Sequence, residues 1–198
     1  MRKILLSMAV ASILSVPSYA QTLDVEIENT KQTIHSFGAS DAWSINPTIN
    51  KWQKKGDDAA IDHLADLLFS TDNGIGLTAW RFNIGAGSTE QGDGSFIRDP
   101  LRRAELLVPE PGGAIDTTKQ QGQIRFMQEA HQRGVDNFIA FSNSPPHYLT
   151  KNGLTHPTAA DDLGSTNLKP ESVDAFSDFL VEVLAYLRSE EVGIPVNY

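Results

Sequence analysis

The sequence contains no cysteine among its 198 residues, which excludes a disulfide scaffold, a thiolate zinc site and a cysteine nucleophile. Basic side chains are in deficit, because 16 Lys and Arg stand against 25 Asp and Glu, for a net charge of −9. That balance argues against a nucleic-acid partner or an anionic membrane surface. Long hydrophobic runs are also missing: the longest, residues 4–16, would extend only about 20 Å as a helix, too short to span a bilayer. The apolar content of 40% is that of a globular protein.

The first twenty residues have the pattern of a secretory signal peptide. Arg2 and Lys3 precede the apolar run, and Ser18 and Ala20 place small residues where a signal peptidase cleaves. We therefore predict residues 1–20 as a signal peptide removed before Gln21, and an exported protein that is periplasmic, on the outer surface or extracellular. A retained membrane anchor is the alternative.

The rest of the chain alternates between extended apolar runs and amphipathic helices. Strands are expected at 23–27, just before Phe37, at 77–84, at 138–141 and from Ile194 onward. Three helices are expected, each with one apolar face turned inward. The first begins at Asp57 or Asp58 and turns Ile61, Leu64, Leu67 and Leu68 inward, and the second, at 120–133, turns Ile124, Met127 and Ala130 inward. The third runs from Pro170 to Gly193, and its inward residues are Val173, Phe176, Leu180, Val183, Leu184 and Leu187.

This order predicts an α/β fold with a parallel sheet, either an open doubly wound sheet or a closed barrel. The long segments 40–55, 85–118 and 142–169 all follow strands and are expected to be loops. Because function in both folds gathers at the carboxyl ends of the strands, that edge is the predicted functional edge.

Alternation along strand 77–84 places Thr78, Trp80, Phe82 and Ile84 toward covering helices and turns Arg81 and Asn83 inward. An inward Arg81 fits either a substrate site or a structural ion pair. Asp41 fits either a cap or a hydroxyl-binding group, and Trp43 either core or a sugar platform.

No cofactor or metal is predicted. The sequence Gly85-Ala86-Gly87 has Glu90 where a dinucleotide fingerprint needs its third glycine. The histidines lack zinc-ligand spacing, and Ser142 lacks the G-x-S-x-G context of a nucleophile.

Three motifs, in order, carry a family resemblance. They are Phe-Gly-Ala-Ser-Asp-Ala-Trp-Ser at 37–44, Trp-Arg-Phe-Asn-Ile-Gly-Ala-Gly-Ser at 80–88, and Phe-Ser-Asn-Ser-Pro-Pro-His-Tyr-Leu-Thr-Lys-Asn-Gly at 141–153. Together with Leu-Lys-Pro-Glu at 168–171 and Tyr198, they resemble the opening motifs of family 30 glycoside hydrolases, particularly the endo-β-1,6-galactanase-like branch.

The resemblance implies a (β/α)8 TIM barrel with an accessory β-sandwich. Residues 21–34 would supply the first sandwich strand, and residues 35–198 the first three βα units and the start of the fourth barrel strand. It also implies retaining hydrolysis by two glutamates, with Arg81 orienting the nucleophile. Asp41, Trp43, Asn83, Ser142, Asn143, His147 and Tyr148 become the expected rim that binds an oligosaccharide or polysaccharide.

The sequence departs from the family pattern in one respect. The resemblance implies an acid/base glutamate in an Asn-Glu-Pro motif and a nucleophile later in the chain, but no such motif occurs before Tyr198, so neither implied glutamate is present. A (β/α)8 barrel takes about 250 residues. We therefore expect the N-terminal portion of an exported glycosidase acting on β-linked, galactan-type polysaccharide, inactive alone, with no catalytic residue in these 198. A true short product that folds poorly or pairs with another chain is the other explanation. A non-catalytic carbohydrate-binding or interaction module is the alternative function, and a doubly wound protein with unrelated chemistry is a third.

Overall fold

The computed structural model describes residues 24, 28–156 and 167–198. The chain divides into two units, Met1–Thr33 and Ile34–Tyr198, and every helix and strand described below belongs to the second. The predicted signal peptide lies outside the described residues, as does the strand predicted at 23–27 apart from Asp24.

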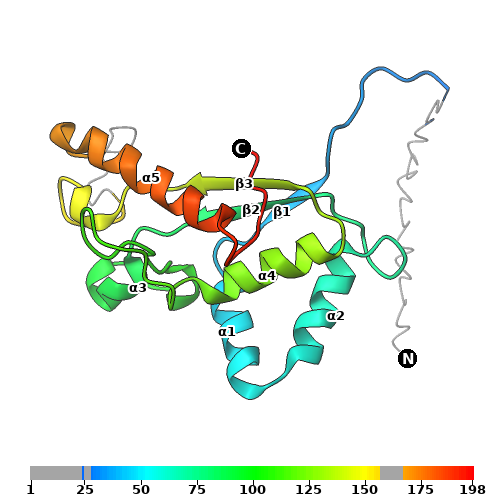
Figure 1. The fold of residues 1–198 in the computed structure, drawn as a ribbon, viewed down its shortest axis with the longest axis horizontal. Helices are drawn as coiled ribbons and strands as arrows, with labels where there is room; N and C mark the ends of the chain where they lie inside the picture. The colour runs from blue at the N-terminus through cyan, green and yellow to red at the C-terminus, as the bar shows by residue number, and fades with distance from the viewer. Residues whose placement is uncertain (1–23, 25–27, 157–166) are drawn as a thin grey trace, which may run out of the picture. The chain divides into compact units, whose positions relative to one another are not determined.

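Three parallel strands form the sheet, in the order β1 (Gly38–Ser40), β2 (Ala79–Ile84) and β3 (Asn137–Ser142) (Figure 1). Ser40 pairs with Arg81 and Asn83 pairs with Phe141, so the carboxyl ends of the strands meet at one edge. The last residues continue this order: Val196 forms a parallel bridge with Phe138, and the Ala140 N–H donates to the Tyr198 carbonyl at 2.8 Å. The predicted parallel α/β arrangement and the extended segment at 194–198 are confirmed.

Figure 1 shows α1 (Ile45–Lys55), α2 (Asp58–Phe69) and α4 (Gln121–Gln132) on the same side of the sheet. Helix α5 (Val173–Arg188) contributes Phe179, Val183 and Leu187 to the hydrophobic core. The core lies between the sheet and these helices. β2 contributes Trp80, Phe82 and Ile84, as predicted, and α4 contributes Phe126 and Met127. Phe82, Phe126 and Met127 are completely buried, so the hydrophobic effect holds β2 against α4.

Local signals explain where these helices begin and end. The Asp57 side chain accepts a hydrogen bond from the Ala60 N–H at 3.2 Å and caps α2 as predicted. Gly134 follows α4 with a φ of +88°, a conformation that favours glycine. Pro170 opens the short 3₁₀ turn η5 (Pro170–Ser172) that leads into α5.

The predicted loop at 40–55 is wrong, because most of it is helix α1. Ile45, Ile49 and Trp52 recur at helical spacing and pack against the core, and Pro47 is tolerated because it lies in the first turn. The strand expected before Phe37 lies instead at Gly38–Ser40.

Three predicted core-facing residues are exposed instead. Leu67 is 44% exposed because Ile61, Ala65 and Phe69, spaced four apart, form the buried stripe of α2. Val173 is 56% exposed at the first residue of α5. Thr78 is exposed and precedes β2, where its hydroxyl accepts a hydrogen bond from the Phe37 N–H.

The segment 85–118 is built of short helical pieces, not of loop alone. These are α3 (Ser88–Gln91) and the 3₁₀ turns η1 (Gly92–Ser95) and η2 (Pro100–Arg102), followed by the buried Leu106, Leu107 and Val108. Gly85 permits the chain to return across the end of β2, because a Cβ there would lie 1.8 Å from the Glu105 carbonyl oxygen. The segment 142–169 contains a further turn, η3 (His147–Leu149), in its described part.

Candidate functional site

A cleft of about 510 Å³ opens at the carboxyl edge of β2 and β3. Asn83 and Ile84 at the end of β2 line it, together with Asn143 and Ser144 after β3 and Trp43 after β1. The segment after β2 supplies most of its remaining wall, including Phe96, Ile97, Arg98, Asp99 and Arg102. The cleft therefore lies at the strand edge that the sequence predicts as functional.

Trp43 presents an aromatic surface to this cleft. Its peptide bond to Ala42 is cis, and the residue is 37% exposed. The Arg102 guanidinium carbon lies 4.5 Å from the centre of its ring, a cation–π contact between the segments that follow β1 and β2. This contact holds the ring at the wall of the cleft.

Two amide side chains lie together in the cleft. Asn83, at 3% exposure, comes from β2, and the Asn143 Nδ2 atom donates to the Asn83 Oδ1 atom at 3.5 Å. An aromatic ring beside amide donors and acceptors matches the chemistry of a sugar ring, which has an apolar face and hydroxyls at its edge.

Asp41 lies behind the cleft and does not line it. It is 1% exposed, and both carboxylate oxygens accept hydrogen bonds at 2.9 Å: Oδ1 from the Asn83 N–H and Oδ2 from Gln123 Nε2. Burial raises the pKa of Asp41 to about 7, although these hydrogen bonds and Arg81 favour the charged form. Asp41 therefore ties the end of β1 to β2 and α4.

Further amides complete this buried network. The Asn83 carbonyl accepts from Gln120 Nε2 at 2.9 Å and from Gln123 Nε2 at 3.1 Å. Glu105 Oε2 accepts from Asn46 Nδ2 at 2.9 Å and from the Gln120 N–H at 2.6 Å. Sequence reasoning missed these groups because their partners lie far apart in the chain, up to 82 residues for Asp41 and Gln123.

Arg81 lies on the face of the sheet opposite the helices, as the alternation predicts, but outside the cleft. Its guanidinium is 4.0 Å from the centre of the Phe141 ring, and within the described residues it forms no ion pair. It lines a separate depression with Ser36, Ser40 and Ile139. The structure therefore does not bring Arg81 together with Trp43.

His147 and Tyr148 connect the segments that follow β2 and β3. The His147 N–H donates to the Ala86 carbonyl at 3.0 Å, and the Tyr148 hydroxyl donates to the Val108 carbonyl at 3.0 Å. Burial lowers the pKa of His147 and raises the pKa of Tyr148 to about 12, so both side chains are neutral near pH 7. Ser142 likewise supports its own loop by donating to the Ser144 carbonyl at 2.8 Å.

Of the predicted site residues, then, Trp43, Asn83 and Asn143 line the cleft, whereas Asp41, Arg81, Ser142, His147 and Tyr148 do not. Sequence reasoning missed the lining residues Phe96, Arg98, Arg102, Thr155 and His156. The one local signal was Phe96, a large apolar residue in a Gly- and Asp-rich segment, which is 70% exposed in the structure.

The described cleft offers binding groups and a single carboxylate. Asp99 is the only acidic residue among its described lining, and its Oδ1 atom accepts the Leu101 N–H at 3.0 Å. Retaining glycosidases use two carboxyl groups about 5 Å apart. No group of three or more His, Asp or Glu side chains suited to a metal occurs in the part of the chain that the structure describes. Among the helices of those same residues, none combines the length and the apolar character needed to span a bilayer.

Comparisons with solved structures place these features in a known fold. A conserved exported protein from Bacteroides fragilis is 35% identical, with a TM-score of 0.72 over 88% of this chain and 35% of that one. The catalytic domain of a family 30 xylanase C from Talaromyces cellulolyticus is 25% identical, with a TM-score of 0.56 over 85% of this chain and 36% of that one.

An endo-β-1,6-glucanase shares the fold at 18% identity, with a TM-score of 0.54 over 83% of this chain and 34% of that one. The chain thus spans about a third of the length of each of these structures. The family model described as O-Glycosyl hydrolase family 30 matches residues 20–198. With three parallel strands, a cleft at their carboxyl edge and this match over nearly its whole length, the chain belongs to glycoside hydrolase family 30.

Proposed function

We propose that this chain forms the substrate-binding part of a retaining glycoside hydrolase that acts on a β-linked, galactan-type polysaccharide. Residues 35–198 would supply the first βα units of a (β/α)8 barrel and residues 21–34 a strand of the accessory sandwich. The observation that carries the proposal is the meeting of the Trp43 ring with the Asn83 and Asn143 amides in one cleft. An apolar platform flanked by a few fixed polar groups is the usual construction of a small-molecule site.

The family match supports a carbohydrate substrate and does not name the sugar. One of the compared structures is a xylanase and another an endo-β-1,6-glucanase, so proteins with this fold differ in the sugar that they accept. The galactan-type substrate rests on the motif resemblance alone. Export rests on the pattern of residues 1–20 and on the likeness to an exported protein of Bacteroides fragilis.

The catalytic glutamates are, in this proposal, outside the 198 residues. Asp99, the one carboxylate described in the cleft, uses an oxygen to cap η2 and has no acidic neighbour among the described lining residues. The same observation favours a second candidate, a carbohydrate-binding module without hydrolysis. Sequencing the gene past the codon of Tyr198 tells the two apart: an open frame encoding Asn-Glu-Pro within a few residues supports the enzyme, and a stop codon supports the module.

Binding of defined oligosaccharides tests the cleft directly. Calorimetric titration should show the chain binding β-1,6-galactotetraose more tightly than β-1,6-glucotetraose or β-1,4-xylotetraose. Trp43→Ala should weaken binding by roughly fivefold or more, because an aromatic contact is worth about 1 kcal/mol beyond its buried area. Phe37→Ala is the matched control, since Phe37 is 64% exposed at the opposite end of β1. Equal losses in both variants, or no binding of any of the three sugars, would refute the proposed cleft.

Hydrolysis is measured in parallel as release of reducing ends from the same tetrasaccharides. We expect none from residues 21–198, because the proposal places both catalytic carboxylates elsewhere. Turnover that survives purification would overturn that placement while leaving the binding cleft intact.

A further inference from the structure

A second groove, of about 450 Å³, lies between α1 and the segment that contains η2. One side carries Asn50, Lys51, Lys54 and Lys55 from α1, and the other carries Arg103 and Glu105. We call this the α1 groove. It shares no lining residue with the cleft, so the chemistry of the proposed active site does not account for it.

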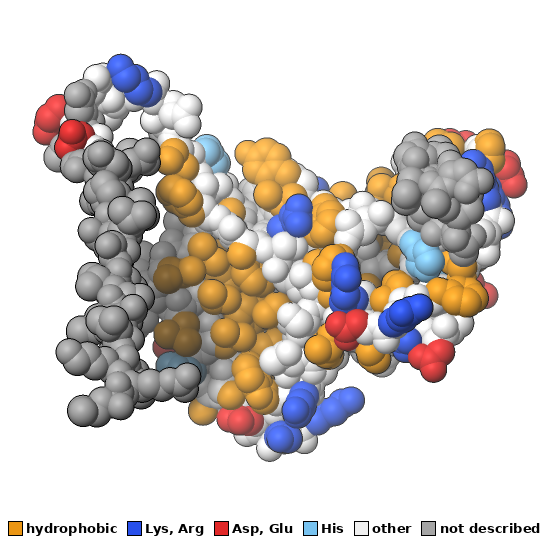
Figure 2. Space-filling model, turned by 180° about the vertical axis from the view of Figure 1, so that it is seen from behind, with side chains coloured by type: hydrophobic (Ala, Val, Ile, Leu, Met, Phe, Trp, Pro, Cys, Tyr) orange, Lys and Arg blue, Asp and Glu red, His pale blue; other side chains and the backbone are white. Residues whose placement is uncertain are grey.

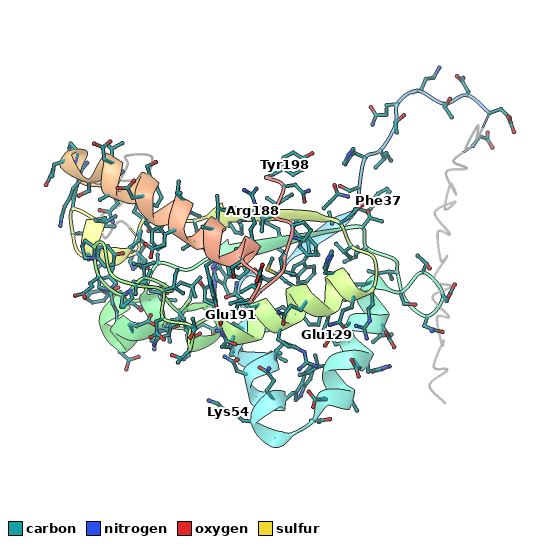
Figure 3. All side chains as sticks on the ribbon, viewed as in Figure 1. Phe37, Lys54, Glu129, Arg188, Glu191 and Tyr198 are labelled. Atoms are coloured by element: carbon teal, nitrogen blue, oxygen red, sulfur yellow. The ribbon has the colours of Figure 1, made fainter. Side chains whose placement is uncertain are left out.

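The lysines of the α1 groove are available to a ligand. Lys51, Lys54 and Lys55 are exposed, and within the described residues none of them forms an ion pair with a carboxylate. Figure 2 shows basic side chains gathered at the lower edge of the molecule, and Figure 3 shows the labelled Lys54 pointing outward there, at the end of α1. Three free ammonium groups on one side of a groove are notable in a protein with a net charge of −9.

A purely structural role explains only part of this cluster. Lys54 and Lys55 lie in the last turn of α1, where cations interact favourably with the helix dipole. Lys51 lies a turn earlier and gains little from that effect, which fades beyond the last turn. Its place beside the other two on the wall of a groove is instead what an anionic ligand requires.

The acidic residues near the groove are already engaged. Glu105 accepts hydrogen bonds from Asn46 and from the Gln120 N–H, and Asp93 pairs with Arg103 at 2.7 Å. Asp93 is balanced by Arg103, whereas Glu105 keeps its negative charge because its hydrogen-bond partners are neutral. The three lysines outnumber this one carboxylate, so the groove as a whole stays positive. The Asn50 amide adds a neutral group suited to a hydroxyl.

The α1 groove and the cleft share a wall. Asp99 and Arg102 line the cleft, whereas their neighbours Pro100 and Arg103 line the groove, so η2 separates the two depressions. A saccharide chain that leaves the cleft across η2 would meet the lysines next. Described groove residues include no aromatic side chain on which a nucleic-acid base would stack, which favours a saccharide over an oligonucleotide.

We infer that the α1 groove binds the carboxylate or sulfate groups of an acidic saccharide chain. The inference goes beyond the proposed function, because a neutral galactan offers no anion to Lys51, Lys54 or Lys55. It predicts that the natural polysaccharide carries uronic acid or sulfate groups next to the segment held in the cleft.

The test compares two variants with the same change in charge. Lys51→Gln/Lys54→Gln removes two charges from the groove, and Asn73→Asp/Gln132→Glu lowers the net charge equally at exposed positions outside it. Thermal unfolding verifies that all proteins are folded. The ligands for calorimetry are tetragalacturonate, a sulfated galactotetraose, neutral β-1,6-galactotetraose and a short single-stranded oligonucleotide.

We expect the groove variant to bind its acidic ligand roughly tenfold more weakly, because each exposed ion pair lost contributes a severalfold change in affinity. The control variant should bind every ligand with the affinity of the wild type. Added salt should weaken the binding of the acidic ligands and leave the binding of neutral galactotetraose unchanged. Whichever of tetragalacturonate and the sulfated sugar binds more tightly identifies the anion. Equal losses in both variants, no binding of either acidic sugar, or tighter binding of the oligonucleotide would overturn the inference. Binding of neutral galactotetraose should be unchanged in the groove variant, so failure of the cleft and failure of the groove are told apart.

Discussion

Asp41 gives the sharpest test of the buried network, because its charge is costly where it lies. The carboxylate is 1% exposed and has hydrogen bonds from Asn83 and Gln123 but no ion pair among the described residues. Asp41→Asn keeps the shape and leaves an oxygen to accept the Asn83 N–H. The new amide faces the Gln123 amide nitrogen and forfeits that bond, which costs about 1 kcal/mol at every pH.

The dependence on pH distinguishes this substitution from a simple loss of contact. Burial raises the pKa of Asp41 from 3.8 to about 7, so between these values the folded protein holds a proton that the unfolded chain has released. The stabilising contribution of the protonated carboxyl is complete below pH 3.8 and is lost as the pH rises through about 7. From about pH 5 to about pH 7.5 the wild type should lose roughly 2.5 kcal/mol relative to Asp41→Asn, at about 1.4 kcal/mol per pH unit below the folded-state pKa.

Urea unfolding at several pH values over that range measures the difference. Subtracting the curve of the variant from that of the wild type removes the titration of other groups, including His147. Asp116→Asn is the control, because hydrogen bonds from Thr118 lower the pKa of the exposed Asp116 and its effect should be constant above about pH 5. Parallel stability curves for wild type and Asp41→Asn would refute the reasoning, since they would mean that Asp41 is charged in the folded protein throughout.

Four further substitutions probe the core, the ion-pair network and the loops. Phe82→Ala removes a fully buried ring and should lower the free energy of unfolding by about 3–5 kcal/mol in urea. Glu129→Gln removes the charge of a carboxylate that is 4% exposed and bonded to two arginines at 2.7 and 2.6 Å, and should lower the free energy of unfolding by about 2 kcal/mol. Asp58→Asn removes a 66% exposed partner of Arg125 and should lower it by less than about 0.5 kcal/mol. Gly87→Ala should lower the melting temperature and weaken tetrasaccharide binding, because Gly87 has a φ of +96° and its Cβ would lie 2.5 Å from His147 Cδ2. A variant that binds sugar as the wild type does would show that the loops adjust independently.

The sequence predicted β2 and β3 because each shows a pattern of its own, whereas β1, the three residues Gly38–Ser40, shows none and was expected earlier in the chain. β2 alternates along its length, which identifies it by period, and β3 has a short apolar run at 138–141 whose length suits a buried strand. Helix α1 was missed for a local reason: Pro47, two asparagines and three lysines hide a short apolar stripe of Ile45, Ile49 and Trp52. Its formation depends on packing against α4, which no local pattern reports.

The residues of the candidate site also differ in how far the sequence could place them. Trp43, Asn83 and Asn143, three of the residues expected at the rim, line one cleft because each comes at or soon after the end of a parallel strand, and those ends share an edge. No comparable rule places Arg98 and Arg102, because their positions depend on how the segment 88–105 folds back on itself. The Ala104 N–H donates to the Ser88 hydroxyl at 2.8 Å, a contact between residues 16 apart that no periodicity predicts.

Asn83 joins the core to the cleft. Its side chain lines the cleft, while its N–H is held by Asp41 and its carbonyl by Gln120 and Gln123 at the start of α4. A shift of α4 toward or away from the sheet must therefore stretch hydrogen bonds that fix the backbone under the Asn83 amide. Because those bonds are buried, stretching one leaves an unpaired polar group that water cannot satisfy. The position of the cleft's polar groups is consequently set by the packing of α4 on β2, so substitutions in this network should change stability and sugar binding together.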